Sequence, residues 1–192
     1  MTVIAVLDAN VLYPLKLRGM LLWVAYQNCF TPIWSTIILD EWTRNLKKNN
    51  PDIDVNKLEK SCRQVNQGFP YACVDEEEIE QFLSQVPQLP DKDDRHVVAA
   101  ALASEALYLV THNLKDFPNS VLKPLGLKAL SPDNFFQLLI EKYPEEVYSG
   151  VEEARKRWKK PPFNQEALIA WMQKNKLKQL ASFITQHSKL TL

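Results

Sequence analysis

Residues 3–7 (VIAVL) form an uninterrupted apolar run that ends directly at Asp8. Because polar residues do not alternate with the apolar ones, this run predicts a strand that is buried on both faces. Similar runs at 71–74, 107–111 and 127–130 predict further strands, and segments with helical spacing lie between them. This β/α alternation predicts an α/β fold in which helices cover both faces of a central, mostly parallel sheet.

The predicted helices follow the spacing of apolar residues and the positions of capping residues. Pro32 is expected to break the chain before a helix that Ser35 caps and that runs to about Lys48. Ser131 is expected to cap another helix, with Pro132 in its first turn. Further helices are predicted at 17–26, 55–65, 75–86, 96–105, 166–175 and 177–186. The many small residues of the segment 96–105 predict close packing against the sheet.

Composition narrows the class of protein. A chain of 192 residues with 46% hydrophobic residues can bury a sizeable core. The apolar run at the N-terminus contains an aspartate and lacks a basic start, so it predicts a strand and not a signal peptide. No apolar stretch approaches the roughly 20 residues that span a bilayer. The three cysteines are odd in number and lack metal-type spacing, which favours a reduced, cytoplasmic setting.

Acidic residues are expected at the ends of the predicted strands and on a helix face beside them. They are Asp8, Glu41, Asp94 and Asp116. Ligands of parallel α/β sheets gather at the carboxyl ends of the strands, so these side chains are expected to meet there. Carboxylates from separate elements repel one another unless a cation lies between them, and the hard ions Mg²⁺ and Mn²⁺ prefer oxygen ligands. Because water bound to such an ion can attack phosphorus, the pattern predicts a metal-dependent nuclease.

Each acid also has a structural explanation. Asp8 and Asp116 can form turns, and any of Asp91, Asp93 and Asp94 can cap the helix that follows them. It is the combination of acids and its spacing that favours a functional site.

Four segments in this order carry a resemblance to a known family: LDANVL, ILDEW, DRHVVAAALA and LVTHNLKDF. They resemble the motifs of PIN-domain ribonucleases, and most closely those of the VapC-like toxins of bacterial toxin–antitoxin modules. The resemblance covers residues 3–135 and implies a three-layer α/β/α fold. Asp94 is preferred over Asp91, the reserve candidate, because it keeps the family's distance to Ala100 and Ala101.

The resemblance implies an endoribonuclease whose catalytic residues are Asp8, Glu41, Asp94 and Asp116. In this family such residues hold one or two divalent ions, so Mg²⁺ or Mn²⁺ is expected on the three aspartates, with Glu41 binding through water or orienting the nucleophile. Thr111 matches the hydroxyl residue that opens the last motif, and Asn113 stands where many relatives have Asp; both are candidates for substrate contact.

The partners that the resemblance implies are an RNA substrate (tRNA, rRNA or mRNA) and a protein antitoxin, and it leaves room for a homodimer. The mechanism requires no histidine base, so His96 and His112 are interpreted as structural. His112 lies within the last motif, next to the candidate site residues, so contact with substrate stays open for it.

The C-terminal part of the chain differs in charge from the rest. Residues 1–150 hold 14 Lys and Arg against 20 Asp and Glu, a balance of −6, whereas residues 151–192 hold 9 against 3, a balance of +6. The resemblance implies a PIN-like nuclease domain at 1–142, and residues 143–192, which lie outside it, are expected to form a basic helical extension. Candidate RNA contacts there are Arg155, Arg157 and Lys159, around Trp158. An alternative explanation is structural, because cations at the C-terminal end of a helix interact favourably with the helix dipole.

Two other functions remain open at this point. One is a PIN fold that has lost cleavage and only binds RNA or protein. The other is a phosphatase that forms an aspartyl-phosphate, but this class needs an Asp-x-Asp pair at the first strand, and position 10 is Asn. Metal-dependent cleavage of RNA, binding without cleavage and acyl-phosphate formation distinguish the three.

Overall fold

The computed structural model describes residues 3–159 and 163–190. Its centre is a parallel sheet with the strand order β3-β2-β1-β4-β5. The strands are β1 (Ile4–Leu7), β2 (Thr31–Ser35), β3 (Cys73–Val74), β4 (Tyr108–Val110) and β5 (Lys128–Leu130). The parallel pairing confirms the predicted α/β class.

Helices connect the strands and follow the last one. Between β1 and β2 are α1 (Ala9–Leu12) and α2 (Leu15–Tyr26), and between β2 and β3 are α3 (Thr36–Asn49) and α4 (Val55–Gly68). Between β3 and β4 are α5 (Glu76–Leu83) and α6 (Arg95–Ala103), and between β4 and β5 are η1 (Leu114–Asp116), α7 (Asn119–Leu122) and η2 (Lys123–Leu125). After β5 come α8 (Pro132–Ile140), α9 (Pro144–Arg157), α10 (Gln165–Lys174) and α11 (Lys178–Leu190).

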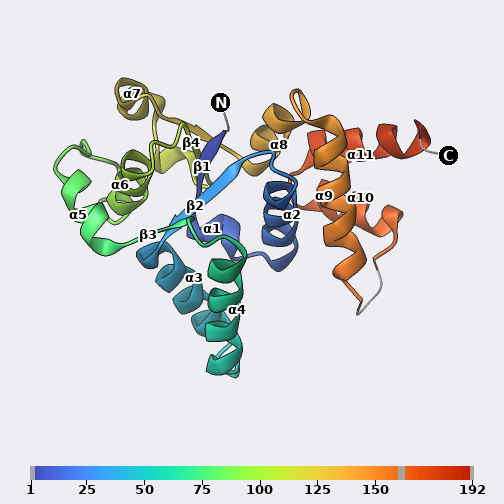
Figure 1. The fold of residues 1–192 in the computed structure, drawn as a ribbon, viewed down its shortest axis with the longest axis horizontal. Coiled ribbons are helices and arrows are strands. Elements are labelled where there is room, and N and C mark those ends of the chain that lie inside the picture. The colour runs from blue at the N-terminus through green and yellow to red at the C-terminus, as the bar shows by residue number, and fades with distance from the viewer. Residues whose placement is uncertain (1–2, 160–162, 191–192) are drawn as a thin grey trace.

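The strand order reverses between β1 and β4. From β1 the chain adds β2 and β3 on one side, and it then crosses back to add β4 and β5 on the other. Because parallel crossovers are right-handed, the two directions put their helices on opposite faces of the sheet. Figure 1 shows α5 and α6 on one face and α2, α8 and α9 on the other. The reversal point, at the carboxyl ends of β1 and β4, is where such folds bind ligands.

The segment around Pro32 corrects the sequence analysis, because it forms β2 and does not break the chain. Pro32 is buried and pairs with Ala5 of β1. Alternate backbone N–H groups of a parallel strand point to opposite neighbours: Thr31 donates to Val3 on the β1 side, and Trp34 donates to Ala72 on the β3 side. The nitrogen of Pro32 therefore points toward β3, which pairs with β2 only from Trp34 onward. No hydrogen bond is lost at this position.

The predicted caps and the close packing of the alanine-rich helix are confirmed. The side chain of Ser35 accepts a hydrogen bond from the backbone N–H of Ile38, and that of Ser131 accepts one from Asn134. Helix α6 packs against β1, β2 and β4. Its residues Val97, Val98, Ala99, Ala100 and Ala101 have no exposed surface. Small side chains allow this helix to lie directly on the sheet.

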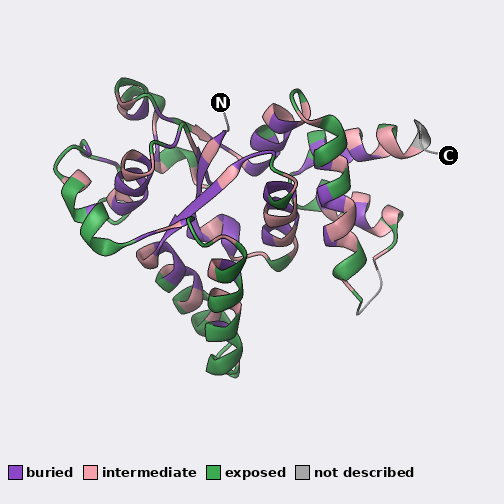
Figure 2. Cartoon of the chain, viewed as in Figure 1, coloured by how far each residue is buried: buried purple, intermediate pink, exposed green. Residues whose placement is uncertain are grey.

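A single hydrophobic core runs from the sheet into the C-terminal helices. Figure 2 shows buried residues along the strands, α2, α6 and the inner sides of α8 to α11, whereas α4 and α5 are largely exposed. No described helix is both long and apolar enough to cross a membrane.

Helix α9 packs closely on α2, and Gly150 is the point of nearest approach. A Cβ atom at this position would lie 2.8 Å from the backbone nitrogen and Cα of Val24. Since real Cβ atoms essentially never approach backbone so closely, the two helices would have to separate. The position of the whole C-terminal extension against the sheet domain therefore depends on the missing side chain.

We expect Gly150→Ala to destabilise the protein by about 1 to 3 kcal/mol, as overpacking of a buried interface does. This corresponds to a fall of roughly 2 to 10 °C in Tm for a chain of this size, measured by thermal unfolding. Gly68→Ala is the matched control, because a Cβ there meets nothing within 4 Å. It should leave stability unchanged or raise it by up to about 1 kcal/mol. Equal losses in the two variants would contradict this account.

Candidate functional site

The site begins where β1 and β4 end side by side. The backbone N–H of Asp8 donates to the carbonyl of Val110, at 3.1 Å, so the residue after β1 is anchored to the end of β4. Thr111 follows Val110 and is anchored in turn to β5, through its N–H and the carbonyl of Leu130, at 3.0 Å. The strand pairing alone thus brings Asp8 and Thr111 together at the reversal of strand order.

Asp8 stands at the N-cap position of α1, and its side chain is held by Thr111 and Asn10. Its carbonyl begins α1, but its side chain makes no capping hydrogen bond. Its Oδ2 accepts hydrogen bonds from Thr111 Oγ1 and from Asn10 Nδ2, both at 2.6 Å. Both donors bind the same oxygen, which leaves Oδ1 without a side-chain donor among the described residues. Asp8 is only 5% exposed, and burial raises the pKa of its carboxyl.

Thr111 is fully buried and organises the loop after β4. Its hydroxyl donates to Asp8 and accepts from Asn10 Nδ2 and from the backbone N–H of Asn113, each at 2.9 Å. With no exposed surface, this hydroxyl holds the acidic residue in place, and the substrate contact that the sequence suggested for Thr111 stays a prediction. Asn113 in turn donates from Nδ2 to Asp116 Oδ2 in the short helix η1. Both residues therefore position an acid.

Glu41 comes from α3 and meets α6 through His96. The His96 ring nitrogen Nε2 lies 3.2 Å from Glu41 Oε1, and His96 is largely buried. Arg18 fixes the other end of this arrangement: its guanidinium donates to the carbonyl of Leu12 at the end of α1, at 2.6 Å, and lies 4.3 Å from the ring centre of Trp42. The helix that follows Asp8 is thereby tied to the helix that carries Glu41.

Asp94 stands at the start of α6, and its charge is opposed by the other acids. The pKa of its carboxyl is raised to about 6. Burial is the largest cause, and the charges of Asp8, Asp91, Asp116 and Glu41 add to it. Although Asp94 occupies the cap position, its side chain makes no capping hydrogen bond. The charges of Asp8, Asp116 and Glu41 thus act on Asp94, and neither Asp8 nor Asp94 uses its side chain as a helix cap.

The described residues do not form a finished metal centre. In the ranges 3–159 and 163–190, no three His, Cys, Asp or Glu side chains stand close enough together to hold an ion. The donor set nevertheless suits a hard divalent cation, because it consists of carboxylates. The charges of Asp8, Asp116 and Glu41 oppose ionisation of Asp94, and a cation would relieve this repulsion.

Comparison with known proteins gives the family. The family model described as "PIN domain" matches residues 5–115, which is more than half of the chain. The chain belongs to the PIN-domain family. A second family model, described as "VapC50 C-terminal domain", matches residues 132–186.

One curated relative comes from Mycobacterium tuberculosis (strain ATCC 25618 / H37Rv) and carries the name "Putative ribonuclease VapC50". It is 40% identical to this chain over 76 residues, which cover 40% of the chain and 45% of that protein. The aligned part thus spans less than half of either protein.

The match to the C-terminal model begins at the start of α8, ten residues before the boundary that the sequence analysis placed at 142. Helix α8 packs on β5 of the PIN domain and also on α11. It belongs physically to both parts, and the division into 1–142 and 143–192 stays a prediction.

Two residues of the PIN domain matter more than the sequence analysis indicated. Asn10, noted from the sequence as a departure from an Asp-x-Asp pair, binds Asp8, Thr111 and the backbone N–H of His112. His96, interpreted as structural, contacts Glu41. The two residues are 55 positions apart in the chain, and only the fold brings them into contact. Asp91, the reserve candidate, is exposed and accepts a hydrogen bond from the backbone of Asp93, so it forms a turn.

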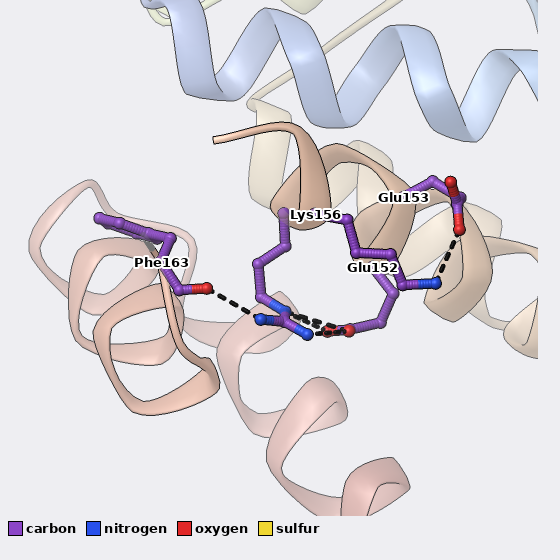
Figure 3. A network of polar contacts seen from close by, with 5 residues as sticks. Glu152, Glu153, Lys156 and Phe163 are labelled. Atoms are coloured by element: carbon purple, nitrogen blue, oxygen red, sulfur yellow. Dashed lines mark hydrogen bonds and ion pairs between the residues drawn. The ribbon is translucent and has the colours of Figure 1, made fainter. Parts of the chain in front are cut away.

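The three basic residues proposed as RNA contacts differ in whether their side chains form ion pairs within the protein. Arg155 makes a two-pronged ion pair with Glu152, with contacts of 2.7 to 3.0 Å, and donates to the carbonyl of Phe163. Figure 3 shows this network beside the pair of Lys156 and Glu153. Arg155 therefore joins α9 to the segment before α10.

Arg157 lies over the ring of Trp23 on α2, 4.3 Å from its centre, and is exposed together with Lys159. Of the three candidates, these two keep charge at the surface.

The raised pKa of Asp94 has a consequence for stability. A carboxyl whose pKa rises from 3.8 to about 6 on folding disfavours the folded state when it is ionised. This cost is absent below pH 3.8, grows as the pH rises and is complete above about 6. We expect Asp94→Asn to raise the Tm of the metal-free protein at pH 7.5 by roughly 1 to 5 °C, and the gain to shrink as the pH falls toward 4.

Thermal unfolding in EDTA across this pH range measures the effect. Asp93→Asn, an exposed neighbour, is the control and should show no such trend. A lower Tm for Asp94→Asn at pH 7.5 would mean that the carboxylate has stabilising partners and is not opposed by its neighbours.

Proposed function

We propose that the protein is a metal-dependent endoribonuclease that hydrolyses phosphodiester bonds of RNA, and that it acts in the cytoplasm as the toxin of a toxin–antitoxin pair. The observation that carries the proposal is that the charges of Asp8, Asp116 and Glu41 act on the partly buried carboxyl of Asp94, beside the reversal of strand order. Membership in the PIN-domain family and the name of the mycobacterial relative support the same activity. An antitoxin that covers the acidic site belongs to this proposal.

Asp8, Asp94 and Asp116 would hold Mg²⁺ or Mn²⁺, and Glu41 would orient the attacking water. When bound, the ion lowers the pKa of a water molecule and offsets the charge that develops on the phosphate. The chain's own contribution is to position the carboxylates: Thr111 and Asn10 hold Asp8, Asn113 holds Asp116, and His96 holds Glu41.

Asp94 also links activity to pH. Its pKa of about 6 means that a proton competes with the cation below this pH, so occupancy of the site is expected to increase as the pH rises through 6.

Cleavage of total cellular RNA by the purified protein tests the proposal. We expect cleavage with Mg²⁺ or Mn²⁺, none in EDTA, and a loss of at least about 100-fold in Asp8→Asn, since even residues behind metal ligands cost 10- to 100-fold. Asp91→Asn is the matched control, because it removes the charge of an acid that lies three residues before Asp94 and forms a turn. Its activity should stay within a few-fold of that of the wild-type protein. Binding of RNA without metal-dependent cleavage would instead favour a PIN domain that only binds.

Metal binding is measurable without any RNA. At a metal concentration 100 times Kd, a ligand of the folded state stabilises it by about 2.7 kcal/mol, or roughly 5 to 10 °C in Tm for a chain of this size. We expect Mn²⁺ to raise the Tm of the wild-type protein at pH 7.5 and to have little effect on Asp8→Asn or Asp116→Asn. Equal shifts in all three proteins would place the ion elsewhere.

A further inference from the structure

A cavity of about 460 Å³ lies beside the acidic site, where the C-terminal helices meet the PIN domain. Its walls come from the loop after β4, the start of α8 and the turn between α10 and α11. We call this cavity the lysine pocket, and its polar lining residues are His112, Ser131, Asp133, Asn134, Lys174, Asn175 and Lys176.

The lysine pocket adjoins the catalytic network directly. The backbone N–H of His112 donates to Asn10 Oδ1, at 3.0 Å. The amide nitrogen of the same Asn10 donates to Asp8, at 2.6 Å. One side chain therefore separates the wall of the pocket from the first acid of the site.

The pocket carries a net positive charge, because its two lysines outnumber its one carboxylate. Neither Lys174 nor Lys176 forms an ion pair with any residue in the described parts of the chain. The pocket also contains Asp133, but this carboxylate is buried and accepts hydrogen bonds from the backbone N–H groups of Gln179 and Leu180 at the start of α11. Its charge is used to fix α11 on α8 and hence to hold the turn with both lysines beside His112.

The backbone conformation of Lys176 suggests which substitution is best suited to test the pocket. Its φ angle is +62°, in the left-handed region that glycine and asparagine adopt at least cost. A lysine is thus tolerated where the fold alone favours another residue, and replacing it with Asn is expected to keep or improve stability.

An RNA strand that reaches the acidic site meets a repulsive surface. The ion offsets charge at the scissile phosphate, but the neighbouring phosphates still face the carboxylates. They need a cationic contact nearby, and the lysine pocket supplies one at the carboxyl end of β4 and β5. Phosphates in proteins are commonly bound by basic side chains and by polar groups at helix N-termini. The lysine pocket contains two lysines, a histidine and the polar groups at the start of α8.

We propose that the lysine pocket binds a backbone phosphate of the RNA substrate next to the scissile one, through Lys174 and Lys176. This role rests on the proposed function, because it assigns the pocket to the same substrate. The C-terminal helices then act as the part of the protein that aligns the RNA strand with the acids.

The test is binding of a fluorescein-labelled single-stranded RNA to the full chain carrying Asp8→Asn, followed by anisotropy over a series of salt concentrations. We expect Lys176→Asn and Lys174→Gln each to weaken binding about 3- to 10-fold. Each should also reduce the slope of log K against log salt by about 0.7, the value for one lost contact to a single strand. Lys178→Gln is the matched control, since it removes the same charge two residues away and does not line the pocket.

Thermal unfolding of Lys176→Asn separates loss of binding from loss of structure, because its Tm should equal or exceed that of the parent. The proposal is overturned if the chain does not bind RNA, or if Lys176→Asn and Lys178→Gln have the same affinity and salt slope. Failure of the nuclease proposal is distinct: wild-type protein would then cleave no RNA with any divalent metal, while the effects of the two lysine variants on binding would persist.

Discussion

The hydrogen bonds that join Asp8, Asn10 and Thr111 at the ends of β1 and β4 are the interaction on which the site depends. They close the point where the strand order reverses, and they hold a buried carboxylate in one orientation. The same cluster reaches Asp116 through Asn113 and the lysine pocket through His112. A change in this cluster would therefore move two acids and the pocket wall together.

Electrostatic repulsion is the second constraint. In the sheet domain, burial and the charges of neighbouring carboxylates together raise the pKa of Asp94 to about 6. A protein can retain such an arrangement when a ligand of opposite charge compensates for it, at the expense of stability in the free state. The packing of α6 on the sheet and the contact between His96 and Glu41 supply the rigidity that this arrangement requires.

The C-terminal helices are part of the same folded unit. Gly150 lets α9 lie against α2, and Asp133 fixes the start of α11 on α8. Because these contacts are buried, the turn that carries Lys174 and Lys176 has a defined place beside the loop after β4. The positive charge that the sequence concentrates after residue 150 is thus divided: Arg155 is used to join helices, whereas the lysines of this turn remain available.

The sequence by itself determined the parallel α/β class, most helices and the caps Ser35 and Ser131, because apolar periodicity and capping are local properties. Motif order selected the four acids, whose role stays a prediction. The sequence did not reveal β2, since the cost of Pro32 depends on whether β3 reaches far enough to need its N–H. It also did not reveal the pair of His96 and Glu41, the burial of Thr111 or the lysine pocket. Each of these depends on segments far apart in the chain, and only tertiary packing decides which of them meet.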